Sequence, residues 1–110
     1  MVIETVVMGI WLTITILDLV AELVLKFTQI LGWFRNRRRH LTGYALSEAE
    51  RDEVGFTLQN LRANGQYRTV QGVLNTRTNQ VAADARAITS NAIDDQLASH
   101  HRGSRLVIYN

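Results

Sequence analysis

The charged residues of the first thirty-four positions share one narrow side when the segment is drawn as a helix. Glu4, Asp18, Glu22 and Lys26 are the charged side chains of this stretch. At 100° per residue they occupy a sector about 80° wide. The same sector holds Met8, Trp11, Thr15, Gln29 and Trp33. Because a helix at the surface of a soluble protein has an apolar stripe on a mostly polar cylinder, these reversed proportions predict a helix surrounded by lipid.

Length and flanking residues favour a membrane-spanning helix over residues 1–34. The thirty residues from Thr5 to Phe34 form a helix of about 45 Å, longer than a hydrocarbon core of about 30 Å. Trp33 precedes a cluster of four arginines: Arg35, Arg37, Arg38 and Arg39. Aromatic residues followed by cations are expected where a span emerges on the cytoplasmic side. We therefore predict a single-pass membrane protein with its N-terminus outside and its C-terminal region on the cytoplasmic side.

The acidic residues are the main objection to a lone span. Fourteen Leu, Ile, Val and Phe residues between Ile10 and Phe34 contribute roughly −4 to −8 kcal/mol to insertion, whereas three central charges cost roughly +8 to +10 kcal/mol. The charges must then face a partner helix or water. The predicted intramembrane association seam consists of Trp11, Thr15, Asp18, Glu22, Lys26, Gln29 and Trp33. A helix lying in the membrane interface and a helix buried in a soluble bundle are the alternatives.

The rest of the chain is read as helical because it contains no proline. Residues 35–46 form a basic juxtamembrane collar and linker, whose arginines contact lipid head groups and set the topology. Ser47 and Glu50 match a capping box, and helices are predicted over about 48–63, 66–74 and 80–101 within a helical region spanning 47–103. The last helix should end at the cations and glycine of 100–103.

Two further features concern packing of the C-terminal part. A narrow seam with spacing 4, 3, 4 is typical of a coiled coil or an antiparallel helix pair, and it comprises Val81, Ala85, Ile88 and Ala92. Residues 104–110 form an apolar tail that either packs on the helices or adds as a strand to a partner. The predicted fold class is therefore all-α, with an N-terminal single transmembrane helix followed by a small helical hairpin or bundle.

Catalytic and metal-binding patterns are absent from the sequence. There is no cysteine, no glycine-rich phosphate loop and no nucleophile elbow. His100 and His101 are adjacent, so on a helix they point about 100° apart and do not share one metal ion. The whole positive excess lies in the cluster 35–40, which disfavours a nucleic-acid-binding face. We expect no enzyme, no cofactor and no metal centre.

The predicted function is structural. The chain is interpreted as a small single-pass scaffold subunit that oligomerises or docks into a larger membrane-bound assembly, such as a bioenergetic or secretion complex or a viral or phage membrane. Its predicted partners are the lipid bilayer and either further copies or other membrane subunits. One alternative is an oligomeric pore former of the viroporin or holin type, with Asp18, Glu22 and Lys26 facing water. The other is a soluble helical dimer with a regulatory or nucleic-acid-binding role.

Overall fold

Strands, and not helices, make up most of the described residues. The computed structural model describes residues 1–7, 9–39 and 53–109, with the side chains of residues 7 and 37–39 left aside. The elements in chain order are β1 (Val2–Val7), β2 (Ile10–Leu25), α1 (Phe27–Arg39), β3 (Glu53–Leu61), β4 (Tyr67–Asn75), β5 (Gln80–Val81), β6 (Ala85–Ile93), α3 (Asp95–His101) and β7 (Leu106–Tyr109).

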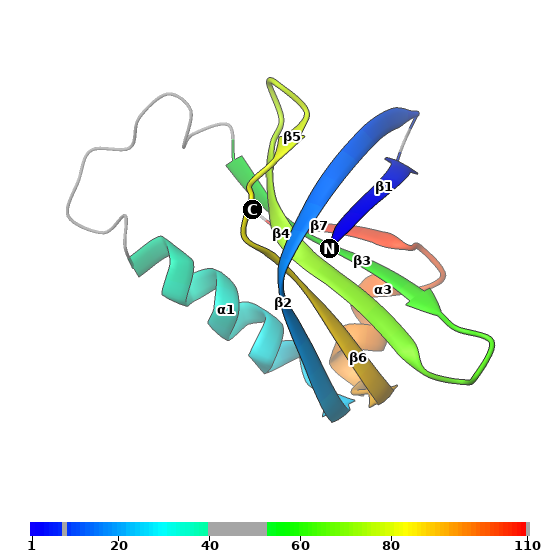
Figure 1. Ribbon diagram of the computed structural model, residues 1–110. Coiled ribbons are helices and arrows are strands. Elements are labelled where there is room, and N and C mark those ends of the chain that lie inside the picture. The colour runs from blue at the N-terminus through cyan, green and yellow to red at the C-terminus, as the bar shows by residue number, and fades with distance from the viewer. Residues whose placement is uncertain (8, 40–52, 110) are drawn as a thin grey trace.

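The strands form one mixed sheet in the order β1-β2-β6-β4-β3-β7, with the short β5 paired to β4. All neighbouring strands are antiparallel except β2 and β6, which run parallel. α1 and α3 lie on one face of the sheet, and the hairpin of β1 and the first part of β2 curls over the other face (Figure 1). The sheet is thus a middle layer between helices and a hairpin.

The long strand β2 has two halves with different neighbours. Its first half pairs with β1, from Ile10 opposite Val7 to Thr15 opposite Val2. Its second half pairs with β6, and the register shifts between Ile16 and Asp18. A bulge of this kind adds a residue to one strand and increases its local twist. The strand therefore leaves the hairpin layer and enters the central sheet at this point.

Each face of the sheet has its own hydrophobic core. Under the hairpin, Leu12, Ile14 and Ile16 of β2 pack against Phe56 and Leu58 of β3. The opposite core joins the helices to the sheet through Leu25, Ile30, Phe34, Ile88 and Leu97. Because side chains alternate between the faces of a strand, β2 and β6 supply residues to both cores.

One carboxylate ties the two helices together. Asp94 is the N-cap of α3, and its Oδ1 accepts a hydrogen bond of 2.9 Å from the Leu97 amide. Both oxygens of Asp94 also accept from the amide of Phe27, the first residue of α1, at 3.2 and 3.1 Å. The first N–H groups of a helix have no partner within the helix. Asp94 therefore satisfies orphan donors of both helices at once.

The all-α prediction and the membrane-spanning helix over 1–34 are wrong. Residues 1–25 are the hairpin and edge of a sheet, and α1 begins only at Phe27. None of the helices in the described part of the chain has the length and apolar character needed to cross a membrane. The predicted single-pass topology, membrane location, scaffold function in a membrane assembly and pore function depended on that helix, so they are overturned with it.

The predicted C-terminal helices are also wrong except near the end of the chain. β3 and β4 occupy most of the ranges 48–63 and 66–74, and β5 and β6 lie within 80–101. The capping box at Ser47 lies outside the described residues. Within the range 80–101 only α3 is helical; it ends at His101, with Arg102 in the left-handed region at φ 33°. The tail residues form β7, which pairs antiparallel with β3 of the same chain.

No coiled coil or helix-pair seam is formed by the residues predicted to make one. Val81 lies in β5, whereas Ala85, Ile88 and Ala92 lie in β6. Ala85 and Ile88 are three residues apart, an odd number, so they point to opposite faces of the strand and belong to different cores. Residues with a 4, 3, 4 spacing lie on one face of a helix, but in a strand they are divided between its two faces.

Candidate protein-interaction surface

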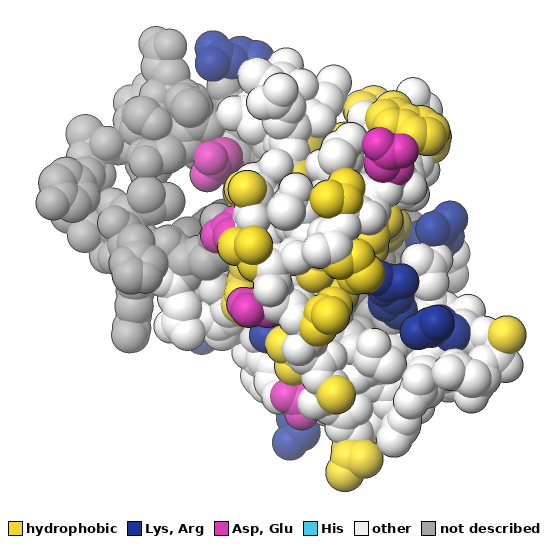
Figure 2. Space-filling model, viewed as in Figure 1, with side chains coloured by type: hydrophobic (Ala, Val, Ile, Leu, Met, Phe, Trp, Pro, Cys, Tyr) yellow, Lys and Arg dark blue, Asp and Glu magenta, His cyan; other side chains and the backbone are white. Residues whose placement is uncertain are grey.

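The exposed hydrophobic side chains are concentrated in the first twenty-four residues. Of eleven large hydrophobic residues exposed in the described chain, nine lie there: Met1, Val2, Val6, Ile10, Trp11, Leu17, Leu19, Leu23 and Val24. Figure 2 shows hydrophobic side chains running as a band along this side of the molecule. Contiguous exposed apolar patches on a soluble fold mark binding surfaces, whereas scattered single residues do not. The concentration along β1 and β2 singles out this region.

The second half of β2 is an open sheet edge among the described residues. The pairing with β1 ends at Thr15, and one more backbone bond of 2.7 Å joins the Ile16 amide to the Met1 carbonyl. From residue 17 to residue 25 the strand pairs with β6 on one side only. In such a strand, alternate backbone N–H and C=O groups point away from the sheet and are free to pair with another strand. We call residues 17–25 the open edge.

The open edge has one leucine face and one acidic face. Leu17, Leu19 and Leu23 are 67%, 71% and 76% exposed. Ala21 lies between Leu19 and Leu23 on the same face, because alternate residues share a side of a strand. The other face, which points towards α1, carries Asp18 and Glu22.

Arg86 of β6 lies beside these acids. It is directly opposite Asp18 in the parallel register, and its Nε donates a 2.8 Å hydrogen bond to Gln71 Oε1. Burial lowers the pKa of Arg86, and the carboxylates of Asp18 and Glu22 act in the opposite direction. The guanidinium also lies 5.5 Å from the ring centroid of Trp33. The acids of the open edge are therefore partly balanced from within the fold.

The predicted association seam is divided between three places. Trp11, Thr15, Asp18 and Glu22 are in β2, Lys26 is in the link to α1, and Gln29 and Trp33 are in α1. Several of them meet around Arg86, whose Nη2 also contacts the Gln29 carbonyl at 3.4 Å. Trp11 is at the hairpin end of β2. Arg86 was missed by the sequence reasoning, and its position opposite Asp18 becomes evident only once the strands are paired.

The basic cluster lies at the C-terminal end of α1. Arg35 is exposed, and Arg37, Arg38 and Arg39 belong to the same helix. Since no membrane span precedes them, the topological role predicted for these arginines lacks its basis.

A buried hydrogen-bond chain joins β3, α3 and β7. His101 Nδ1 is 3.0 Å from the Ser104 carbonyl oxygen, which only accepts, so Nδ1 carries the proton. In the neutral ring, Nε2 then accepts from the hydroxyl of Thr57 at 2.9 Å, and the Thr57 oxygen accepts from Tyr109 at 3.0 Å. A threonine beside a histidine is also the arrangement of an activated nucleophile. Thr57 has no exposed surface, however, so we assign this chain a structural role.

The buried histidine predicts that the protein loses stability in mild acid. Burial is the main cause that lowers the pKa of His101, and the bond to Ser104 opposes the shift. The unfolded state, with a pKa of about 6.5, then binds a proton more readily than the folded state. The stability that neutral His101 contributes is therefore complete above the unfolded pKa. It is lost as the pH falls from the unfolded pKa towards the lower pKa of the folded state. Urea unfolding at neutral and mildly acidic pH should show a smaller pH dependence for His101→Gln than for the wild type.

The neighbouring histidine supplies the control for this prediction. His100 is exposed, and its ring stacks on Phe27 at 4.1 Å between centroids. The charge of His100 is only the last of the causes that shift the pKa of His101, so His100→Gln should keep most of the pH dependence of the wild type. An unchanged pH dependence in His101→Gln would contradict the assignment of the effect to the buried ring.

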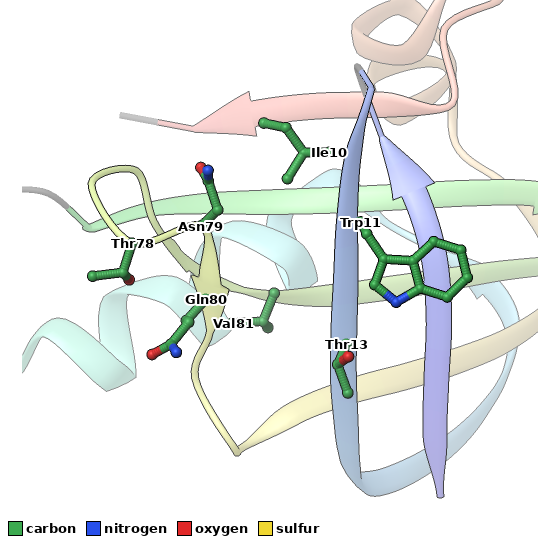
Figure 3. A pocket seen from close by; sticks show the side chains of 7 residues that line it. All are labelled: Ile10, Trp11, Thr13, Thr78, Asn79, Gln80 and Val81. Carbon is green, nitrogen blue, oxygen red and sulfur yellow. The ribbon is translucent and has the colours of Figure 1, made fainter.

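A shallow groove lies between the start of β2 and the turn that joins β4 to β5. Its lining residues are Ile10, Trp11, Thr13, Thr78, Asn79, Gln80 and Val81. Figure 3 shows that the ring of Trp11 lies across β2 from Thr78 and Asn79 and points away from them. None of the lining side chains is charged. The groove thus offers amides and hydroxyls without a facing aromatic ring or an ionic group, and it defines no particular chemistry.

Comparisons with known proteins add no relationship: no family model, no curated protein and no solved structure matches the chain. Within the described residues, no group of three or more His, Asp or Glu side chains is placed to hold a metal ion. The open edge of β2 is consequently the strongest candidate site.

The sequence reasoning missed the leucines of the open edge. It placed Leu17, Leu19 and Leu23 in lipid and treated the polar residues between them as the contact surface. The alternation of Leu19, Ala21 and Leu23 with Asp18 and Glu22 is the signal that could have identified a strand with one apolar and one acidic face.

Proposed function

We propose that this chain is a protein-interaction domain that binds an extended polypeptide strand along the open edge of β2. The observation that carries the proposal is the coincidence of two features over residues 17–25. The backbone there pairs on one side only, and Leu17, Leu19 and Leu23 are largely exposed beside it. Strand addition uses both features, because the backbone provides affinity and alternate side chains provide specificity. The proposal assigns the chain a binding role and no catalytic one.

Natural sheets usually protect such edges. Short edge strands, inward-pointing charges, prolines and covering loops prevent uncontrolled pairing. The open edge here is nine residues long, contains no proline and carries exposed leucines at positions 17, 19 and 23. An edge with this combination is suited to a partner strand.

A photo-crosslinking experiment tests the proposed function. A benzophenone amino acid is incorporated at Leu19 in cells that produce the full chain, and the matched control carries it at Leu61, which is 65% exposed at the end of β3. We expect a discrete adduct from position 19 and none from position 61. Adducts of equal yield at both positions, or none at position 19, would refute the open edge as a binding surface.

A further inference from the structure

We propose that the strand bound by the open edge is the open edge of a second copy of this chain, paired antiparallel across a two-fold axis at Ala21. This inference rests on the proposed function and adds the identity of the partner. It is carried by three observations: the limits of the open edge, the positions of its charges and the positions of its leucines.

The limits of the open edge place the axis. Met1 contacts the backbone of Ile16, so pairing by a partner starts at residue 17. After Leu25 the Lys26 amide is bound by Gln29 Oε1 at 2.9 Å and the helix begins. In an antiparallel self-pair, residues whose numbers have a constant sum are opposite each other. All nine residues are paired only when that sum is 42, which puts Ala21 opposite its own copy.

The pleat restricts the possible registers. Residues directly opposite each other in an antiparallel pair point to the same face. The two-fold axis must therefore pass beside a residue and not between two residues. The nearest competing registers are centred on Val20 and on Glu22.

The positions of the charges disfavour both competing registers. Centring on Val20 sets Asp18 opposite Glu22 twice, and centring on Glu22 sets that residue opposite its own copy. Like charges directly opposite are destabilising in a sheet. Centring on Ala21 sets the two acids opposite Val24 and Val20, so that no carboxylate faces another directly.

The leucine positions favour the same register. With Ala21 at the axis, Leu19 of each copy lies opposite Leu23 of the other, and the small Ala21 pair lies between these two leucine pairs. These side chains are among the most exposed hydrophobic groups of the protein, with Leu19 at 71% and Leu23 at 76%. Pairing would bring them together on one face of a sheet that continues through both copies.

Cysteine crosslinking of the purified full chain tests the register. The chain contains no cysteine, so each introduced thiol is unique. Opposite residues in the pair lie about 4.5 to 5.5 Å apart between Cα atoms, within the range of a disulfide. Under mild oxidation Ala21→Cys should form crosslinked dimers. Leu19→Cys alone should not, since its copies would lie four residues, or about 13 Å, out of register. A mixture of Leu19→Cys and Leu23→Cys chains should crosslink.

Light scattering after size exclusion tests the association itself. The wild type should form a dimer whose fraction rises with concentration, and Leu19→Lys should raise the dimer Kd by about 30-fold or more, the loss expected for a central contact. Leu61→Lys serves as the control and should leave the Kd unchanged. Circular dichroism verifies that each variant is folded.

The possible failures are distinguishable. A wild type that stays monomeric at every concentration overturns the second copy as partner, as does self-crosslinking of Leu19→Cys that matches Ala21→Cys. If the benzophenone at Leu19 then captures a discrete protein of another mass, the proposed function stands and only this inference fails. If it captures nothing, both fail.

Discussion

Replacing Asp94 with alanine should lower the free energy of unfolding by about 1 to 4 kcal/mol, because two helix caps are lost together and each is worth about 0.5 to 2 kcal/mol. The Asp94 carboxylate accepts from the Leu97 amide at the start of α3 and from the Phe27 amide at the start of α1. Without it, both amides lose a charged acceptor in a partly buried position. Urea unfolding followed by circular dichroism measures the loss.

Two variants separate capping from charge. Asp95→Ala removes an exposed acid from the first turn of the same helix, and it should cost less than 1 kcal/mol, the usual size of a charge-dipole contribution. Asp94→Asn keeps one acceptor oxygen, so its loss of unfolding free energy should lie between those of Asp94→Ala and Asp95→Ala. If Asp94→Ala costs no more than Asp95→Ala, the shared cap does not contribute to stability.

Replacing Phe56 with alanine should cost about 3 to 5 kcal/mol, the largest effect that we expect from a single substitution. Phe56 is 2% exposed and lies between the sheet and the hairpin, in the core that contains Ile14 and Leu58. Its removal leaves a cavity that the hairpin of β1 and β2 would have to fill. Thermal and urea unfolding measure the change. Ile108, which is opposite Phe56 in β7 and 41% exposed, provides the control, and Ile108→Ala should cost about 1 kcal/mol or less.

A double-mutant cycle with Gly72 tests the packing of the same ring. A Cβ added at Gly72 would lie 2.9 Å from Phe56 Cε1, closer than carbon atoms normally approach. Gly72→Ala should therefore destabilise the wild type but be tolerated better once Phe56 is alanine. Costs that simply add would show that the ring and the glycine are not coupled.

The sequence supported the wrong periodicity in the first twenty-five residues for a physical reason. Asp18, Glu22 and Lys26 are four residues apart, a spacing that is close to one helical turn and is also a multiple of the two-residue strand repeat. The leucines of the open edge added to the ambiguity, because exposed apolar residues make a strand as hydrophobic as a segment that lies in lipid. Within Leu12, Thr13, Ile14, Thr15 and Ile16, however, the strict alternation and β-branched residues indicate a strand.

Local signals proved more reliable than periodicity. The gaps between the predicted helices, at 64–65 and 75–79, coincide with turns of the structure, although these turns separate strands and not helices. Gly65 has φ +84° and Asn79 has φ 57°, values that glycine and asparagine tolerate best. Turn chemistry depends on the residues themselves, so it was readable. The open edge and the position of Arg86 depend on which strands pair, and the parallel pairing of β2 with β6 is invisible in the local sequence.

The parallel pairing of β2 with β6 also affects how the protein is synthesised. Val20 pairs with Ile88, so these partners are 88 − 20 = 68 residues apart. At 5 to 20 residues per second, about 3 to 14 s pass between the emergence of Val20 from the ribosome and the emergence of its partner. The β1-β2 hairpin can form early. Residues 17–25 remain unpaired on both edges during this time, and their leucines remain exposed to solvent. Exposed apolar surface and unpaired strand edges make a nascent chain prone to aggregation, so this strand is at risk during the interval.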